Sequence, residues 1–299
     1  MKDFTTKPLN FDHFSSKGNQ LKWRDGDDWY KADYLGYEAL AEYVVSDLLK
    51  KSNANANAVA YELVPIRYEN KTFVGCRSKN FLQPQQELIT LQRLYQTYRN
   101  ASLSETLAGQ DVEDKIKHVV DFVEETTGLK GFGSYLTALL EIDALFLNED
   151  RHMNNIAVLF NRDSGTYTYC PIFDNGAALF SDTTMSFLLQ QDAYQCLQTI
   201  EAKPFSRSFE EQVDAAELMY GTQFAFWFDA NDVERLVAQA SAFYENDVLE
   251  RVEQTIREQM RRYAYLRRKA PLENVIKNAA DLHENNGASA IFPKKEREN

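Results

Sequence analysis

The pattern of apolar and polar positions divides the chain into a strand-like first third and a helical remainder. Up to about residue 82, short apolar runs alternate with turn-forming residues, which is typical of a small antiparallel sheet. We predict strands at 21–23, 29–32, 61–66 and 71–78, and a further extended segment near 13–14. One helix interrupts them between residues 37 and 51. Its apolar side chains recur at helical spacing, at Tyr37, Leu40, Ala41, Val44, Val45 and Leu48.

From Pro84 onward the apolar spacing changes to the helical period of about 3.6. We predict helices within 85–98, 112–125, 133–148, 209–219 and 232–268. A pair of strand-like runs, 156–160 and 166–173, interrupts them, and the turn NRDSGT joins the two runs. The expected architecture is α+β, with a small lobe at 1–81, a larger and mainly helical lobe at 82–278, and a polar tail at 279–299.

Composition narrows the class of protein. The chain of 299 residues is 44% hydrophobic, which suffices for a sizeable core. Its net charge of -12 argues against wholesale binding of nucleic acid or of an anionic membrane. Three cysteines without a CxxC pair indicate neither a zinc site nor a disulfide framework, and no apolar run of about 18 residues predicts a membrane span. We therefore expect a soluble, cytoplasmic protein.

The stretch LFLNEDRHMNNIAVLF, residues 145–160, places acids and amides between two apolar runs. Asp150 and Asn155 lie in this turn, and Asp174 follows the predicted hairpin in the segment FDNG. Carboxylate and amide oxygens are the hard ligands that a magnesium ion prefers, which suits Asn155 and Asp174. Asp150 would remain free to orient or deprotonate an attacking hydroxyl.

DRHMNN followed by FDNG resembles the catalytic loop and metal-binding segment of the HipA-like kinases, in particular the short, stand-alone ones. The form DRHxxN is also similar to the phosphoinositide lipid kinases, and both families have a two-lobed protein-kinase-like fold. The resemblance implies that Asp150 is the catalytic acid and that Asn155 and Asp174 bind magnesium. It also implies that His152 lies near the transferred phosphate or braces the loop. Asn175 departs from the usual Asp-Phe-Gly pattern, which puts switching through a Phe side chain in doubt.

A kinase also needs a lysine on a strand of the small lobe and a glutamate on the helix to hold that lysine. Lys31, at the end of the strand WYKAD, fits the lysine. Glu38 and Glu42 compete for the glutamate. At about 100° per residue, Glu38 lies roughly 90° from the centre of the apolar face and Glu42 roughly 130°, so we predict Glu38.

A turn between strands should cover the phosphates of the nucleotide. A small polar turn that contains a glycine is expected to do so through its backbone N–H groups, at Ser15, Ser16, Lys17, Gly18 and Asn19. The adenine-contacting hinge is expected near 78–81. We interpret the basic run 261–270, RRYAYLRRKA, as a solvated face of the last helix.

The favoured function is an ATP- and Mg2+-dependent kinase that transfers the γ-phosphate to a Ser or Thr hydroxyl of a protein, with autophosphorylation as one form. A lipid or small-molecule kinase is the first alternative, although the acidic composition weighs against anionic headgroups. A nucleotide-binding scaffold without activity is the second, although Lys31, Asp150, Asn155 and Asp174 are all present. A metal-dependent hydrolase built on Asp150, His152 and Asp174 is the third, and the chain's four histidines make it the weakest.

Overall fold

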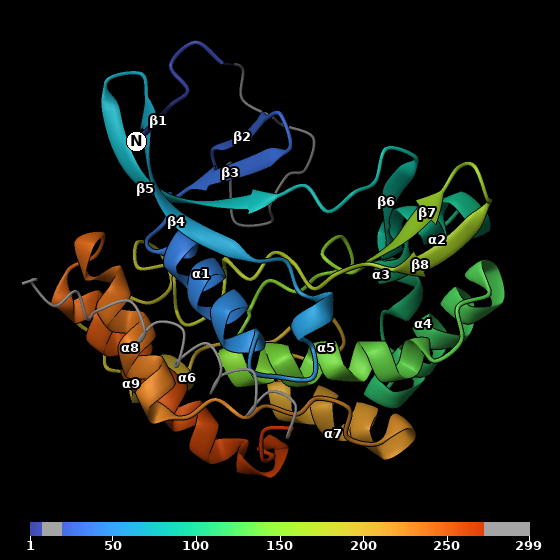
Figure 1. The fold of residues 1–299 in the computed structure, drawn as a ribbon. Coiled ribbons are helices and arrows are strands. Elements are labelled where there is room, and N and C mark those ends of the chain that lie inside the picture. The colour runs from blue at the N-terminus through green and yellow to red at the C-terminus, as the bar shows by residue number, and fades with distance from the viewer. Residues whose placement is uncertain (8–19, 272–299) are drawn as a thin grey trace, which may run out of the picture.

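The small lobe is a five-stranded sheet with one helix beneath it, in blue and cyan in Figure 1. The computed structural model describes residues 1–7 and 20–271. The sheet has the order β1-β4-β5-β3-β2 and is antiparallel, except that β1 pairs with β4 in parallel. Its strands are β1 (Lys2–Asp3), β2 (Lys22–Asp25), β3 (Asp28–Ala32), β4 (Tyr61–Tyr68) and β5 (Lys71–Lys79).

The alternation of side chains along β3 decides which way the predicted lysine faces. Tyr30 and Ala32 join the core of one face of the sheet, where the rings of Trp23 and Phe4 stack 4.9 Å apart. Successive side chains of a strand point to opposite faces, so Lys31 lies on the other face. Lys31 pairs in register with Lys22 of β2 on one side and with Cys76 of β5 on the other.

Helix α1 (Glu38–Leu49) is buried on two sides. Ala39 packs under the sheet with Val59, Tyr61 and Cys76. The predicted apolar face, from Tyr37 to Leu48, instead belongs to the main core of the large lobe. The helix thus lies between the sheet and the helical lobe, and in Figure 1 it is the blue coil at their junction.

The large lobe is mainly helical, as predicted. Within the described residues its helices are α2 (Leu91–Arg99), α3 (Leu103–Leu107), α4 (Val112–Thr127), α5 (Phe132–Phe146), α6 (Ala193–Leu197), α7 (Phe209–Tyr220), α8 (Ala230–Gln239) and α9 (Asn246–Arg262). Three short 3-10 turns occur at Asn55–Asn57, Ala240–Ala242 and Ala264–Leu266. Helix α5 is buried along nearly its whole length and forms the centre of the lobe.

Two predicted helices need correction. The stretch 85–98 begins as strand β6 (Gln86–Thr90), and α2 starts only after Thr90, whose hydroxyl caps the helix by accepting from the Arg93 N–H. The basic run 261–270 leaves helix α9 at Arg262. Its later part pairs through the backbone with residue 226, since the Arg268 N–H donates to the Phe226 carbonyl at 2.8 Å.

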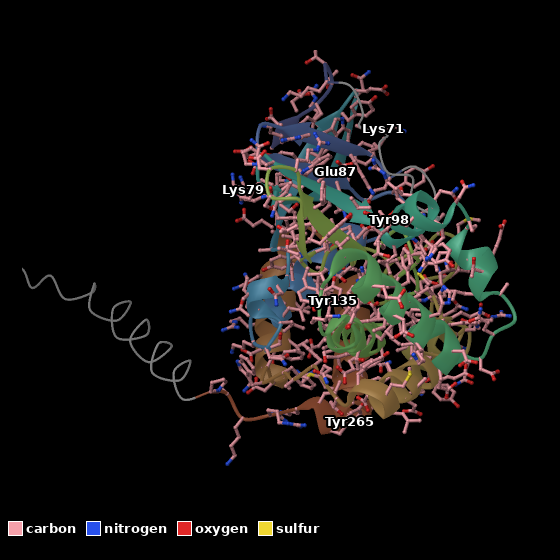
Figure 2. All side chains as sticks on the ribbon, turned by 90° about the vertical axis from the view of Figure 1, so that its right-hand side faces the viewer. Lys71, Lys79, Glu87, Tyr98, Tyr135 and Tyr265 are labelled. Carbon is pink, nitrogen blue, oxygen red and sulfur yellow. The ribbon has the colours of Figure 1, made fainter. Side chains whose placement is uncertain are left out.

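The predicted hairpin is present and gains a third strand. β7 (Ala157–Asn161) pairs with β8 (Thr166–Tyr169), and β6 adds to the other edge of β7 in antiparallel register. This second sheet stands beside the helices, to the right in Figure 1. The labelled Lys71 of the small lobe and Tyr265 of the large lobe lie at opposite ends of the molecule in Figure 2.

The described part of the chain contains no helix with the length and apolar character needed to cross a membrane. Strand β5 ends at Lys79, and the lobe boundary at 81/82 stays a prediction. The phosphate-covering turn at 15–19, the segment near 13–14 and the tail at 279–299 all lie outside the described residues.

Candidate active site

The turn that follows α5 is held rigid by its own backbone. Leu147 takes a left-handed conformation, with φ of 56°, and ends the helix. The His152 N–H then donates to the Asp150 carbonyl at 2.9 Å, and the Asn155 N–H donates to the His152 carbonyl at 2.8 Å. The loop is therefore a compact turn that carries Asp150 and Asn155 at fixed positions before β7 begins.

The buried side chain of Arg151 holds this turn in place through hydrogen bonds. Its side chain is fully buried, and all five of its N–H donors have acceptors. The guanidinium binds both oxygens of Asp143 and donates to the carbonyls of Asn155 and Phe173 and to the side-chain oxygen of Asn175. Arg151 thereby ties the DRHMNN turn to the FDNG segment.

Lys31 joins the two lobes through two carboxylates. Its ammonium lies 2.5 Å from Glu42 Oε1 and 2.6 Å from Asp174 Oδ1. The second Glu42 oxygen accepts from the Asn175 N–H at 2.9 Å, so Glu42 also fixes the FDNG backbone. One buried glutamate therefore positions both the lysine and the predicted metal-binding segment.

The prediction that Glu38 holds Lys31 is wrong. Glu38 lies in the first turn of α1, where its carboxylate accepts from the N–H groups of Tyr34, Leu35 and Gly36. These hydrogen bonds hold the turn that precedes the helix. The apolar-face argument failed because α1 is buried on both sides, so the face away from the hydrophobic core meets the sheet and Lys31 instead of solvent.

Asp174 is held in its charged form. Burial by itself raises the pKa of this carboxyl, but the ammonium groups of Lys31 and Lys22 outweigh burial, and the pKa lies well below its ordinary value. The residue has a left-handed backbone with φ of 61°, which is uncommon outside glycine. Its carbonyl accepts from the Asn148 side-chain amide at 3.4 Å. Asp174 thus presents an ionised carboxylate from a backbone that the loop fixes.

Asp150 is nearly buried and contacts two basic side chains. Lys203 Nζ lies 2.9 Å from its Oδ1, and His152 Nε2 lies 3.8 Å from its Oδ2. The His152 Nδ1 accepts from the Asn154 N–H at 3.2 Å, so a neutral ring carries its proton on Nε2, the nitrogen nearer Asp150. His152 therefore lies beside this acid, and its role in bracing the loop, one of the two that the resemblance implied, stays a prediction.

Two cavities meet at these residues. The aspartate cavity is lined by Asp150, Asn155 and Asp174, together with Lys22 and the FDNG segment's Gly176. The aromatic cavity also borders Asn155 and Asp174, and it extends under the sheet. Its wall includes Lys22, Lys31, Val59, Tyr61, Phe81, Leu82, Leu88 and Phe173. The predicted acid, amide and lysine therefore come together around one continuous region at the lobe junction.

Asn155 and Asp174 suit a divalent cation. Both side chains border the same two cavities, and they offer an amide oxygen and an ionised carboxylate. The Asn155 amide nitrogen donates to the Asp150 carbonyl at 3.0 Å, so its oxygen is the atom left for a metal. The chemistry of these two donors therefore fits magnesium, and their role as its ligands stays a prediction.

Sequence reasoning missed the roles of four residues of this site, Lys22, Asp143, Arg151 and Lys203, and it weighed Glu42 but preferred Glu38. Asp143 had a readable signal, because it is an acid within the otherwise apolar helical run LLEIDALF and so needs a buried partner. Lys22 had none, because its place beside Lys31 depends on the strand register. Burial lowers the pKa of Lys22, although Asp174 partly offsets this effect.

No protein-family model and no curated protein sequence matches the chain. Among solved structures, it is similar to the Helicobacter pylori proinflammatory kinase CtkA, with a TM-score of 0.58 and 18% identity over 86% of this chain and 93% of that one. A choline/ethanolamine kinase family protein from Mesorhizobium loti aligns at a TM-score of 0.26 and 13% identity, over 85% and 94%, and no argument rests on it. The likeness to CtkA confirms the two-lobed kinase-like fold.

Proposed function

We propose that the protein is an ATP- and Mg2+-dependent kinase that transfers the γ-phosphate of ATP to a Ser or Thr hydroxyl of a protein. The observation that carries this proposal is the double salt bridge of Lys31 with Glu42 and Asp174, adjoining the cavity that Asp150 and Asn155 line. Phosphoryl transfer depends more on the positions of the phosphates, the metal and the acceptor than on covalent chemistry by the protein. The lysine, the two acids and the amide of this arrangement are the residue types that hold these groups in position.

The aromatic cavity suits an adenine base. Val59, Tyr61, Phe81, Leu88 and Phe173 give it apolar walls, and the chain at 78–82, which contains the predicted hinge at 78–81, forms one edge. The aromatic faces of adenine gain from such burial, and backbone groups of the hinge would supply the polar contacts that orient its edge. The assignment of the hinge to 78–81 remains a prediction that this cavity supports.

Two lysines face the place where the phosphates would lie. Lys31 and Lys22 are register neighbours on β3 and β2, and both line the aromatic cavity with Asp174. Their charges would offset the triphosphate, and the backbone N–H groups of the turn at 15–19 are proposed to cover it. Magnesium held by Asn155 and Asp174 would neutralise charge on the phosphate oxygens.

The chemical step follows from the position of Asp150. The acceptor hydroxyl oxygen attacks the γ-phosphorus and gives its proton to the Asp150 carboxylate. The bond from the γ-phosphorus to the bridging oxygen breaks, and ADP leaves with that oxygen. His152 keeps the acid in place by the contact between its Nε2 and Asp150 Oδ2.

Transfer of label from γ-labelled ATP tests the proposal. We expect label on the protein itself or on an added protein, and we expect loss of at least about a thousandfold in Asp174→Ala and in Asp150→Ala, because each removes a part of the transfer site. Asp25→Ala is the matched control, since this aspartate pairs with Lys2 on the small-lobe surface. Nucleotide binding without transfer to any acceptor would indicate a scaffold, and label on lipid alone would indicate a lipid kinase.

A further inference from the structure

A second hollow lies against the catalytic loop. We call it the lysine groove, and its wall includes Ser104, Lys115, His152, Lys203 and Pro204. Among the described residues, it shares no lining residue with the aspartate cavity or the aromatic cavity. Lys203 and His152 nevertheless both contact Asp150, which lines the aspartate cavity. Asp150 therefore links the aspartate cavity to the wall of the lysine groove.

The charge of the lysine groove differs from that of the molecule. The chain carries a net charge of -12, yet no described residue that lines this groove is acidic. Lys115 donates to the Phe205 carbonyl at 3.0 Å, a neutral acceptor that leaves its positive charge uncompensated at this contact. Basic side chains beside the catalytic acid of an acidic protein indicate a ligand that carries negative charge.

We propose that the lysine groove is the acceptor site and that it selects a Ser or Thr flanked by Asp or Glu side chains. This inference rests on the proposed kinase function and names its substrate class. Two side chains of the groove wall, Lys203 and His152, contact Asp150, and an acceptor hydroxyl has to come within reach of this acid for the transfer. Lys115 is a specificity residue in this assignment, and its ammonium contacts the Phe205 carbonyl.

Lys203 gives the acidic acceptor a second role. Its ammonium lies 2.9 Å from Asp150 Oδ1, the carboxylate that must receive the hydroxyl proton. An acceptor carboxylate that pairs with Lys203 competes for this ammonium and weakens its hold on Asp150 Oδ1, the atom that receives the hydroxyl proton. An acceptor without a neighbouring acid cannot draw Lys203 away from Asp150. We therefore expect acidic segments to have a higher kcat as well as tighter binding.

A protein segment is favoured over an anionic membrane. The overall negative charge of the chain repels a surface of anionic lipids over the whole contact area, whereas a peptide reaches only the groove. Lipid headgroups therefore enter the test as an alternative acceptor.

The first measurement uses the wild-type protein and matched peptides. Three peptides share one Ser and differ only in its flanking residues, which are Asp, Ala or Lys. A fourth peptide keeps the Asp flanks and has Ala in place of the Ser. We expect kcat/KM for the Asp-flanked peptide to exceed that of the Lys-flanked peptide by at least tenfold, with the difference shrinking as salt rises. The Ser-free peptide reports transfer to other positions.

The second measurement reverses one charge. We expect Lys115→Glu to raise KM for the Asp-flanked peptide about tenfold and to remove or invert the preference, while the affinity for ATP stays within twofold. Lys115→Gln keeps a donor for the Phe205 carbonyl and should raise KM about threefold, which separates charge from any shift of that segment. Lys130→Glu, an exposed lysine after α4, is the matched control and should leave the preference intact.

One result would overturn the inference while leaving the proposed function standing: transfer to peptides at equal rates whatever their flanking charge. Transfer to lipid vesicles but to no peptide would overturn both the acidic acceptor and the Ser or Thr acceptor of the proposed function. If the wild-type protein transfers phosphate to nothing, the proposed function fails and the acceptor site fails with it.

Discussion

At the residue scale, burial decided which glutamate serves Lys31. Glu42 is fully buried and bridges Lys31 and the Asn175 backbone, whereas Glu38 accepts from three N–H groups before α1. A charge removed from water needs a partner of opposite sign, and Lys31 and Glu42 provide this for one another. The angle of a glutamate from the apolar face of α1 therefore does not identify the partner of Lys31. The structure that packs against each side of the helix does.

These two glutamates give a matched pair of variants. Glu42→Gln should lower kcat/KM for phosphate transfer about a hundredfold, because Lys31 loses one of its two anchors and the FDNG backbone loses its acceptor's charge. Glu38→Gln should keep activity within about threefold and lower the free energy of unfolding by about 1 kcal/mol. Steady-state kinetics and urea unfolding measure the two effects. If Glu38→Gln lowers kcat/KM about a hundredfold and Glu42→Gln leaves it nearly unchanged, Glu38 holds the lysine.

At the element scale, α5 is the helix whose buried acids connect the large lobe. Asp143 binds Arg151 beneath the catalytic loop. Glu141, two residues earlier, accepts from the N–H groups of Gln223 and Phe224, which lie beyond the end of α7. A single helix thus anchors the active-site turn at one position and a distant connection at another.

Glu141 predicts a dependence of stability on pH. Burial, and then a hydrogen bond with Glu217, raise its pKa to about 9, although the two backbone N–H groups oppose the shift. The folded state therefore keeps a proton that the unfolded state releases near pH 4.5, and the wild-type free energy of unfolding falls as pH rises from there toward 9.

The variant Glu141→Gln mimics the protonated carboxyl. We expect its unfolding free energy to change less between pH 5 and 9, with the wild type losing up to about 1.4 kcal/mol per pH unit more than the variant. Urea unfolding at each pH measures this. Parallel curves for the two proteins would show that Glu141 is already ionised at neutral pH.

At the scale of the whole molecule, the two lobes meet through α1 and through the loop before it. The main core of the large lobe includes most of the apolar face of α1. The loop at 34–37 bonds to the chain after FDNG, since the Tyr37 N–H donates to the Ser181 carbonyl at 3.0 Å and the Thr184 N–H to the Leu35 carbonyl at 3.0 Å. The position of α1 is thus fixed by the large lobe as much as by the sheet.

Gly36 makes this approach possible. A Cβ atom at residue 36 would lie 2.1 Å from the Ser181 carbonyl oxygen, so Gly36→Ala must push the two backbones apart. We expect a loss of about 1–3 kcal/mol in stability and at least tenfold in kcat. Thr184→Val, which removes only a hydroxyl bond to Leu35, should cost about 1 kcal/mol. Thermal unfolding and kinetics compare them, and an unchanged Gly36→Ala enzyme would show that the lobes do not meet here.

Much of the fold could be read from local pattern. The amphipathic spacing at 37–48 and the helical runs at 112–125, 133–148 and 209–219 correspond to α1, α4, α5 and α7. The run 85–98 was read wrongly as one helix, because Leu88 and Ile89 suit a helix or a strand equally. Only pairing with β7 makes this part of the chain a strand.

The sequence by itself determined the chemical parts of the site: an acid and an amide in DRHMNN, a second acid in FDNG, and a lysine on a strand. DRHMNN and FDNG resemble the corresponding segments of the HipA-like kinases, and this resemblance predicted the two-lobed kinase-like fold. Tertiary structure alone decided that Glu42 holds Lys31, that Arg151 lies buried on Asp143, and that Lys22 and Lys203 face the acids. The reason is physical: sequence spacing reports neighbours along one helix or strand, whereas burial and charge pairing depend on surfaces that meet only after folding.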